Sequence, residues 1–218
     1  VPSPPSPTLP PSPPPPVPPP SSPNLDAVDA CAFAVYDTET TGLANYDVAV
    51  QVAIGFFAMD GTELGWYDKL WRLPQGVSIN PRAEAVHKIS RRLLDERGVR
   101  SAPELEQLKT VFARLKSRGV AIVAHNASFD ERILHQTARA HGIAGWDLCD
   151  TFCTMKTSKG LLRLKMNNSS AYKAPKNVEL YQFFYGTPPA GRLHDAKTDV
   201  RVTAKCFVAG VRRGWWAL

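Results

Sequence analysis

Two acidic residues, Asp37 and Glu39, follow a short apolar segment at residues 32–36 that is typical of a buried β-strand. Residues i and i+2 of a strand point to the same face, so the two carboxylates would lie side by side where the strand ends. Ionised acids repel each other there, and a hard divalent cation such as Mg²⁺ relieves the repulsion because it binds carboxylate oxygens. The alternative is that the two acids lie in a solvent-exposed turn, which would be the preferred interpretation of such a pair if nothing else accompanied it. The pair is therefore a candidate metal site that needs further ligands.

Two later segments could supply those ligands. Asp130 falls in the first turn of a helix that follows an apolar strand at residues 120–124. His194 lies at the entry of the last predicted helix, and Asp199 lies about one turn further along it. Each segment has a plain structural alternative, because Asp130 could complement the helix dipole and His194 could cap its helix. Jointly, the segments bring acids and a histidine from three separate strand or helix ends.

This set of residues resembles the DEDDh 3′→5′ exonucleases, the family of the epsilon subunit of bacterial DNA polymerase III and of ribonuclease T. The match covers residues 32–208, which is nearly all of the part expected to fold. The resemblance implies an α/β, ribonuclease-H-like fold, with a mixed five-stranded sheet flanked by helices. The residues that match the three family motifs are, in order, Asp37 with Glu39, Asp130, and His194 with Asp199.

The same resemblance implies a metal-dependent 3′→5′ exonuclease that acts on single-stranded 3′ ends of DNA or RNA and releases nucleoside 5′-monophosphates, as in DNA repair or proofreading. The implied cofactors are two divalent ions, Mg²⁺ with Mn²⁺ as a substitute, which clamp the attacking and leaving oxygens. His194 would act as the general base. The alternative is a catalytically inactive nucleic-acid-binding or adaptor module on the same fold, against which the intact motif set argues. The implied metal ligands are Asp37, Glu39, Asp130 and Asp199.

Residues near the first two motifs are expected to touch the substrate. Thr40 and the backbone around Thr41 would meet the terminal nucleotide, and Leu43 would wedge against its base. Phe129 would pack on the base or sugar, because aromatic faces stack on bases without reading them. His87, in a segment similar to the family stretch before the second motif, would approach the nucleotide. The alternative for His87 is a residue on a helix surface.

The order of the predicted elements fits a mixed sheet with flanking helices. The pair Asp60-Gly61 predicts a hairpin turn between two apolar runs. Ser101 and Glu104 resemble a capping box at the start of an amphipathic helix. The predicted strands cover residues 32–36, 48–59, 63–73 and 120–124. One helix is predicted to begin near residue 81, and further helices are predicted at residues 101–119, 129–140, 178–185 and 195–208. Residues 156–176 are predicted to form a basic loop.

The N-terminal part is predicted to stay outside the folded domain. Residues 1–23 hold 14 of the 20 prolines, and proline removes backbone donors and fixes φ, so a helix or sheet core cannot form there. Residues 1–30 are expected to be a disordered, polyproline-II-like arm, and residues 31–218 the exonuclease domain. The arm could dock a proline-binding protein partner, although a spacer is the plainer interpretation.

Charge and cysteine content limit the class of protein. The net charge is +6, and residues 142–218 alone carry +7, which suits nucleic-acid binding but also a solvated basic surface. The four cysteines lack zinc-site spacing and are expected to be reduced, mostly buried thiols of an intracellular protein. No apolar run approaches 18 residues, so no membrane span is expected. The pair Trp215-Trp216 should pack on the domain or meet a partner.

Overall fold

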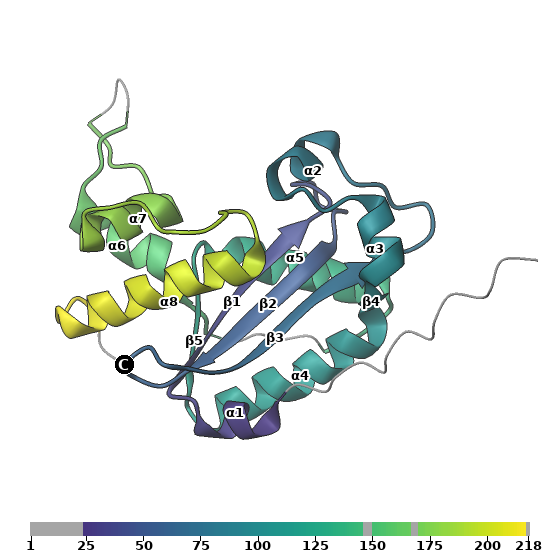
Figure 1. Cartoon of the computed structure of the whole chain (residues 1–218), viewed down its shortest axis with the longest axis horizontal. Helices are drawn as coiled ribbons and strands as arrows, with labels where there is room; N and C mark the ends of the chain where they lie inside the picture. The colour runs from purple at the N-terminus through teal and green to yellow at the C-terminus, as the bar shows by residue number, and fades with distance from the viewer. Residues whose placement is uncertain (1–23, 146–149, 167–169, 217–218) are drawn as a thin grey trace, which may run out of the picture.

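The computed structural model describes residues 24–145, 150–166 and 170–216 (Figure 1). The prediction of a disordered arm at residues 1–23 lies outside the described residues, as does Cys149. Helix α1, Leu25–Ala30, occupies the end of the segment expected to be linker. Its Ala27 and Val28 are buried in the core, so the folded part begins before residue 31.

The centre of the molecule is a six-stranded sheet in the order β4-β3-β2-β1-β5-β6. Strands β1, β2 and β3 form the predicted antiparallel meander, while β5 runs parallel to β1, β6 parallel to β5, and β4 parallel to β3. The mixed sheet is confirmed with six strands instead of five, because two-residue edge strands are too short to leave an alternating pattern in the sequence. The strands are β1 Phe33–Thr40, β2 Ala49–Phe57, β3 Glu63–Arg72, β4 Val99–Arg100, β5 Ala121–Ala124 and β6 Phe152–Cys153.

Helices cover both faces of the sheet (Figure 1). Alternate residues of β1 and β2 enter two separate cores, one under α4 and α5 and the other under α8. Every residue of β2 is buried, which explains its nearly continuous apolar sequence. The remaining helices are α2 Pro81–His87, α3 Arg91–Arg97, α4 Ser101–Ser117, α5 Ala127–Ala140, α6 Thr154–Leu162, α7 Asn177–Tyr185 and α8 Ala196–Arg212.

Two local predictions were wrong. Residues 156–176 are not simply a loop, because α6 extends to Leu162 and a short antiparallel bridge joins Lys165 to Tyr172. Ser101 is not a capping residue, since it lies inside α4 and its hydroxyl bonds the ring of His141 at 2.6 Å. Glu104 is instead buried against β3, where tertiary contacts override the local capping pattern.

The C-terminal tryptophans pack on the domain. Trp216 is 7% exposed and its ring contacts Phe152, Phe184 and Phe207, while the ring of Trp215 lies tilted against that of Phe184. Among the described cysteines, Cys31, Cys153 and Cys206 are buried free thiols, as expected. None of the described helices is both long and apolar enough to cross a membrane.

Candidate active site

The first two acids lie on a part of β1 that has lost one neighbouring strand. Strand β5 pairs with β1 only from Phe33 to Val35, whereas β2 accompanies it to Thr40. The freed edge of β1 would expose unpaired backbone donors, and α5 supplies an acceptor for one of them. Asp130 Oδ1 accepts hydrogen bonds from the backbone N and Oγ1 of Thr38, at 3.0 and 2.7 Å. This contact fixes Asp130 beside the residue that lies between Asp37 and Glu39.

A sharp turn brings α5 to that position. Asn126 adopts a left-handed conformation, φ 71°, which reverses the chain between β5 and α5. The ring of His125 holds the turn, with Nδ1 2.9 Å from Thr154 Oγ1 and Nε2 3.1 Å from Pro175 O. Burial lowers the pKa of His125 to about 4, so this imidazole is neutral and structural.

The entry of α8 positions the histidine and the last acid. Asp195 caps the helix, since its Oδ2 accepts from the backbone N of Thr198 at 3.1 Å. His194, just before the cap, has φ 62°, and its backbone N donates to Asp199 Oδ2 at 2.8 Å. Gln51 of β2 donates to Asp195 Oδ1 at 3.2 Å, which ties the helix entry to the sheet. His194 and Asp199 are therefore held together at the end of β1.

Three of the predicted residues form a possible metal-binding group. Glu39, His194 and Asp199 each offer a ligand atom, and these atoms lie within 4.8 Å of one another. Carboxylate oxygens and an imidazole nitrogen are ordinary donors for divalent cations, so the donor set fits such an ion. The remaining predicted ligands, Asp37 and Asp130, adjoin this group.

The carboxyl groups of the site repel one another electrostatically. Burial, followed by the charges of Asp130, Asp199 and Glu39, raises the pKa of Asp37 well above its usual value. Burial and the charge of Asp199 raise the pKa of Glu39 to about 8. Burial raises the pKa of Asp130 to about 7, against the lowering effect of the Thr38 hydrogen bonds, and burial also raises the pKa of Asp199. At neutral pH the cluster must therefore bind protons or cations.

A cavity of about 660 Å³ adjoins the acids. Four of the five predicted substrate-binding residues line it, namely Thr40, Leu43, His87 and Phe129. Sequence reasoning missed Tyr46, which also lines the cavity and is 83% exposed, like Leu43 at 77%. The available signal was a second large apolar side chain in the loop that carries Leu43, since exposed apolar groups that cluster mark a contact surface.

The loop that presents Leu43 and Tyr46 is firmly anchored. Asp47 Oδ2 accepts from the backbone N of Ala44 at 2.6 Å. Gln136 of α5 donates to the carbonyls of Ala44 and Asp47, at 3.1 and 2.6 Å. The two exposed side chains therefore project from a fixed backbone.

Thr41 is one of those anchors, and the structure places it outside the cavity lining. Its side chain is fully buried and donates to Asp47 Oδ1 at 2.6 Å. Its backbone N donates to Val48 O, and its carbonyl accepts from Asn80 N. Every polar group of Thr41 thus already has a protein partner, and contact between the backbone around Thr41 and the terminal nucleotide stays a prediction.

His87 reaches the cavity with only a small part of its surface. Its ring is 4% exposed, Nδ1 accepts from Ile89 N at 2.9 Å, and Nε2 therefore donates to Thr40 O at 3.1 Å. Burial lowers the pKa of His87, consistent with a neutral ring. Arg192, which sequence reasoning also missed, donates to the carbonyl of His87 at 2.7 Å and links α2 to the loop before His194.

Comparisons with known proteins agree with this geometry. The sequence model of the family described as "Exonuclease" matches residues 34–207. Exodeoxyribonuclease 10 of Escherichia coli K12 is 28% identical over 184 residues, which cover 84% of this chain and 70% of that protein.

Solved nuclease structures share the fold. The nuclease domain of 3′hExo, described as a DEDDh family member bound to rAMP, has a TM-score of 0.64 at 12% identity, over 84% of this chain and 92% of that one. Exonuclease I of Methylocaldum szegediense has a TM-score of 0.64 at 19% identity, over 84% of this chain and 41% of that one. Exonuclease I of Escherichia coli, in complex with a dT13 oligonucleotide, has a TM-score of 0.66 at 16% identity, over 83% of this chain and 41% of that one. The chain thus spans about two fifths of the exonuclease I proteins that it matches.

The family match covers residues 34–207, which is most of the chain, and the acids and histidine of the motif set lie at one end of β1. The chain therefore belongs to the exonuclease family, and its motif residues Asp37, Glu39, Asp130, His194 and Asp199 assign it to the DEDDh group.

Proposed function

We propose that this chain is a metal-dependent 3′→5′ exonuclease that releases nucleoside 5′-monophosphates from single-stranded 3′ ends. The observation that carries the proposal is the meeting of Glu39, His194 and Asp199, whose ligand atoms lie within 4.8 Å, beside Asp37 and Asp130. A purely structural role does not explain this cluster, because buried acids that raise one another's pKa values destabilise a fold unless cations neutralise them.

The acids would hold the cations. Asp37, Glu39, Asp130 and Asp199 supply hard oxygen ligands, which suit Mg²⁺ and also Mn²⁺. A pair of such ions would activate the attacking water and stabilise the charge on the leaving 3′ oxygen. Thr38 keeps Asp130 oriented through its two hydrogen bonds to Oδ1.

His194 would accept the proton of the attacking water. Its ring is exposed to solvent and lies beside Glu39 and Asp199, whereas the rings of His87 and His125 have both nitrogens in hydrogen bonds. An imidazole that is accessible to water can take a proton and return it to solvent.

The cavity would hold the terminal nucleotide. Leu43 and Phe129 would contact the base or sugar, and Thr40 lies where the cavity meets the acids. Tyr46 adds a second ring for stacking. The similar structures have been seen with rAMP and with a dT13 oligonucleotide, so both RNA and DNA are substrates to test.

The test uses the full chain with Mg²⁺ and DNA and RNA strands labelled at the 5′ end. A 3′→5′ exonuclease shortens these strands one nucleotide at a time, whereas 5′→3′ action releases a labelled mononucleotide first. EDTA and the substitution Asp37→Asn should both abolish shortening, with circular dichroism unchanged. The matched control is Asp95→Asn, an exposed acid of α3, which should retain full activity. Unchanged activity of Asp37→Asn would refute the assignment.

The alternative of an inactive adaptor makes a different prediction. If the proline-rich segment carried the function by binding a protein partner, removal of residues 1–23 would abolish that binding. If the chain is an exonuclease, nucleotide release should survive this deletion. A protein partner of that segment would then be detected by its binding to the full chain and not to the truncated one.

A further inference from the structure

Beside the active site lies a second surface that the proposed chemistry does not use. We define the basic arm as residues 156–166 and 170–176, which comprise most of α6 and the two sides of the bridge between Lys165 and Tyr172. Backbone hydrogen bonds hold the two sides together, from Met166 N to Ala171 O at 3.1 Å and from Lys173 N to Leu164 O at 2.8 Å. In Figure 1 this arm projects from α6 and α7 at the same end of the molecule as α2.

The charge of the basic arm is of one sign. Residues 151–178 contain six basic side chains and no acid, so their net charge of +6 equals the net charge of the whole chain. Within the described part of the chain, only Lys173 of these six pairs with a carboxylate, that of Glu179. The others are exposed and have no ion-pair partner among the described residues, so the surface attracts polyanions. The six residues are Lys156, Lys159, Arg163, Lys165, Lys173 and Lys176.

Apolar side chains are interleaved with these charges. Leu161 is 43% exposed, Met166 48% and Tyr172 37%. Exposed apolar and aromatic groups among cations are the pattern of single-strand binding, in which the cations follow the phosphates and rings stack on the bases.

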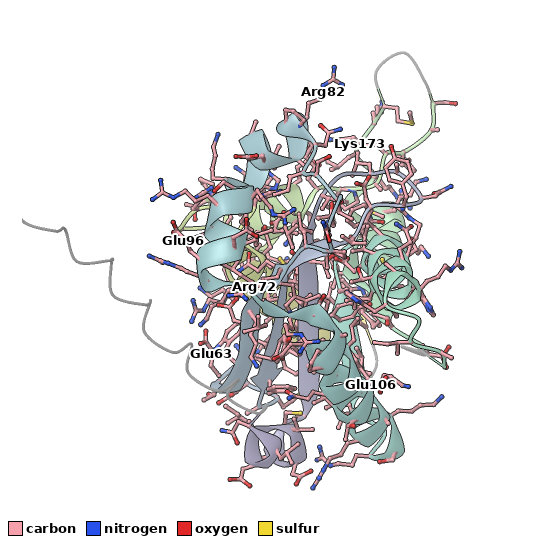
Figure 2. The ribbon with its side chains drawn as sticks, turned by 90° about the vertical axis from the view of Figure 1, so that its right-hand side faces the viewer. Glu63, Arg72, Arg82, Glu96, Glu106 and Lys173 are labelled. Carbon is pink, nitrogen blue, oxygen red and sulfur yellow. The ribbon has the colours of Figure 1, made fainter. Side chains whose placement is uncertain are left out.

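The base of the arm is joined directly to the active site. Pro175 O lies 3.1 Å from Nε2 of His125, in the turn that positions Asp130. Asn177, the residue after the arm, donates to the carbonyl of Asp199 at 3.3 Å and to Thr203 Oγ1 at 2.9 Å. The base of the arm is therefore bonded to the turn before Asp130 and to the helix that carries Asp199. Figure 2 shows Lys173 and Arg82, of the cavity wall, at one end of the molecule and Glu106 at the other.

We propose that the basic arm binds the phosphodiester backbone of the substrate strand several nucleotides upstream of the 3′ end. The inference rests on the proposed function for the position of that end. It adds a binding site that would make the affinity for long strands higher, and more sensitive to salt, than the affinity for short ones. It assigns no role to the arm in the chemical step.

The test compares two charge-matched variants of the full chain. The arm variant carries Lys159→Gln, Lys165→Gln and Lys176→Gln. The control variant carries Arg97→Gln, Arg139→Gln and Lys205→Gln, which are exposed on α3, α5 and α8 and lose the same charge. Binding of a fluorescent 20-nucleotide strand is measured by anisotropy in EDTA, so that the strand is not cut, between 50 and 200 mM salt.

Removal of one cation that binds a phosphate of a single strand reduces the slope of log K against log salt by about 0.7. Removal of three such cations therefore predicts that, between 50 and 200 mM salt, wild type loses roughly 20-fold more affinity than the arm variant. The control variant should keep the wild-type slope. In Mg²⁺, the arm variant should show a raised KM for the 20-nucleotide strand, with kcat unchanged and a trinucleotide hydrolysed as by wild type.

The outcomes separate the two proposals. Equal slopes for the arm and control variants, or an equal rise in KM for the trinucleotide and the long strand, would overturn the basic arm as a strand-binding site. Both results leave the exonuclease assignment intact. If wild type and both variants fail to shorten a strand in Mg²⁺, the proposed function is rejected. The slopes of log K against log salt, measured by anisotropy, would still decide whether the arm binds nucleic acid.

Discussion

Substitution of Glu39 by Gln should stabilise the metal-free protein above neutral pH. Glu39 is 9% exposed, and burial with the charge of Asp199 raises the pKa of its carboxyl group from 4.5 to about 8. A raised pKa means that the folded state binds the proton more tightly than the unfolded state does. The contribution to stability is therefore fully present below pH 4.5 and is lost as the pH rises through about 8.

The magnitude follows from the pKa difference. Each pKa unit corresponds to about 1.4 kcal/mol. At pH 7 Glu39 is ionised in the unfolded state but still mostly protonated in the folded state, and this difference removes up to ~3 kcal/mol from the free energy of unfolding. This is an upper limit, because the raised pKa values of Asp37, Asp130 and Asp199 let these neighbours share the repulsion. For a chain of this size, the corresponding rise in Tm of Glu39→Gln is about 6–12 °C at pH 7.

The assay is thermal and urea unfolding in EDTA at intervals from pH 4.5 to 8.5. The stability gain of Glu39→Gln over wild type should be near zero at the acid end and grow with pH. The control is Glu106→Gln, an exposed acid of α4, whose difference from wild type should be small at every pH. Mg²⁺ should stabilise wild type more than Glu39→Gln, since the variant lacks a ligand. A difference that does not change with pH, or a variant less stable than wild type at pH 8, would refute the electrostatic reasoning.

Two further predictions concern the fold and the cavity. Glu104→Ala should lower the free energy of unfolding, measured in urea, by about 3–5 kcal/mol. Glu104 is 1% exposed, and its carboxylate accepts hydrogen bonds from Lys69 and Tyr67, each at 2.9 Å. A decrease under about 1 kcal/mol, as expected for the control Glu106→Ala, would contradict the buried ion pair. Leu43→Ala should reduce kcat/KM on a single strand about tenfold, because truncation removes roughly 1.4 kcal/mol of packing against the terminal base. Its unfolding free energy should stay within about 0.5 kcal/mol of wild type, because the side chain is 77% exposed, and unchanged kcat/KM would argue against the wedge.

Several elements of the fold were predictable because their signals are local. The antiparallel meander is indicated by apolar runs and by Asp60-Gly61, and the amphipathic helix α4 by its spacing of apolar residues. Strands β4 and β6 were not predictable, since two residues carry no periodic pattern. Helix α6 was mistaken for a loop because its Thr, Ser and Gly residues are weak helix formers, and packing on α7 and α8 compensates for that composition.

The candidate site divides in a similar way. The identities of Asp37, Glu39, Asp130, His194 and Asp199 could be read from motifs, and the structure brings them together. The substrate side was less predictable, because exposure and hydrogen bonding depend on distant partners. Thr41 lies next to Thr40 in sequence, yet its hydroxyl donates a hydrogen bond to Asp47, whereas Tyr46 lines the cavity.

The sequence by itself determined which chemical groups this exonuclease carries and roughly which strand and helix ends carry them, because motif residues and apolar periodicity are properties of short segments. Only the tertiary structure decided that β5 stops short of Asp37, that Asp130 bonds the freed edge of β1, and that the basic arm is tied to the same site. Those arrangements depend on contacts between residues about 90 or 50 positions apart, such as Asp130 with Thr38 and His125 with Pro175. Burial and mutual repulsion of the acids, which set their pKa values, arise only once these segments have met.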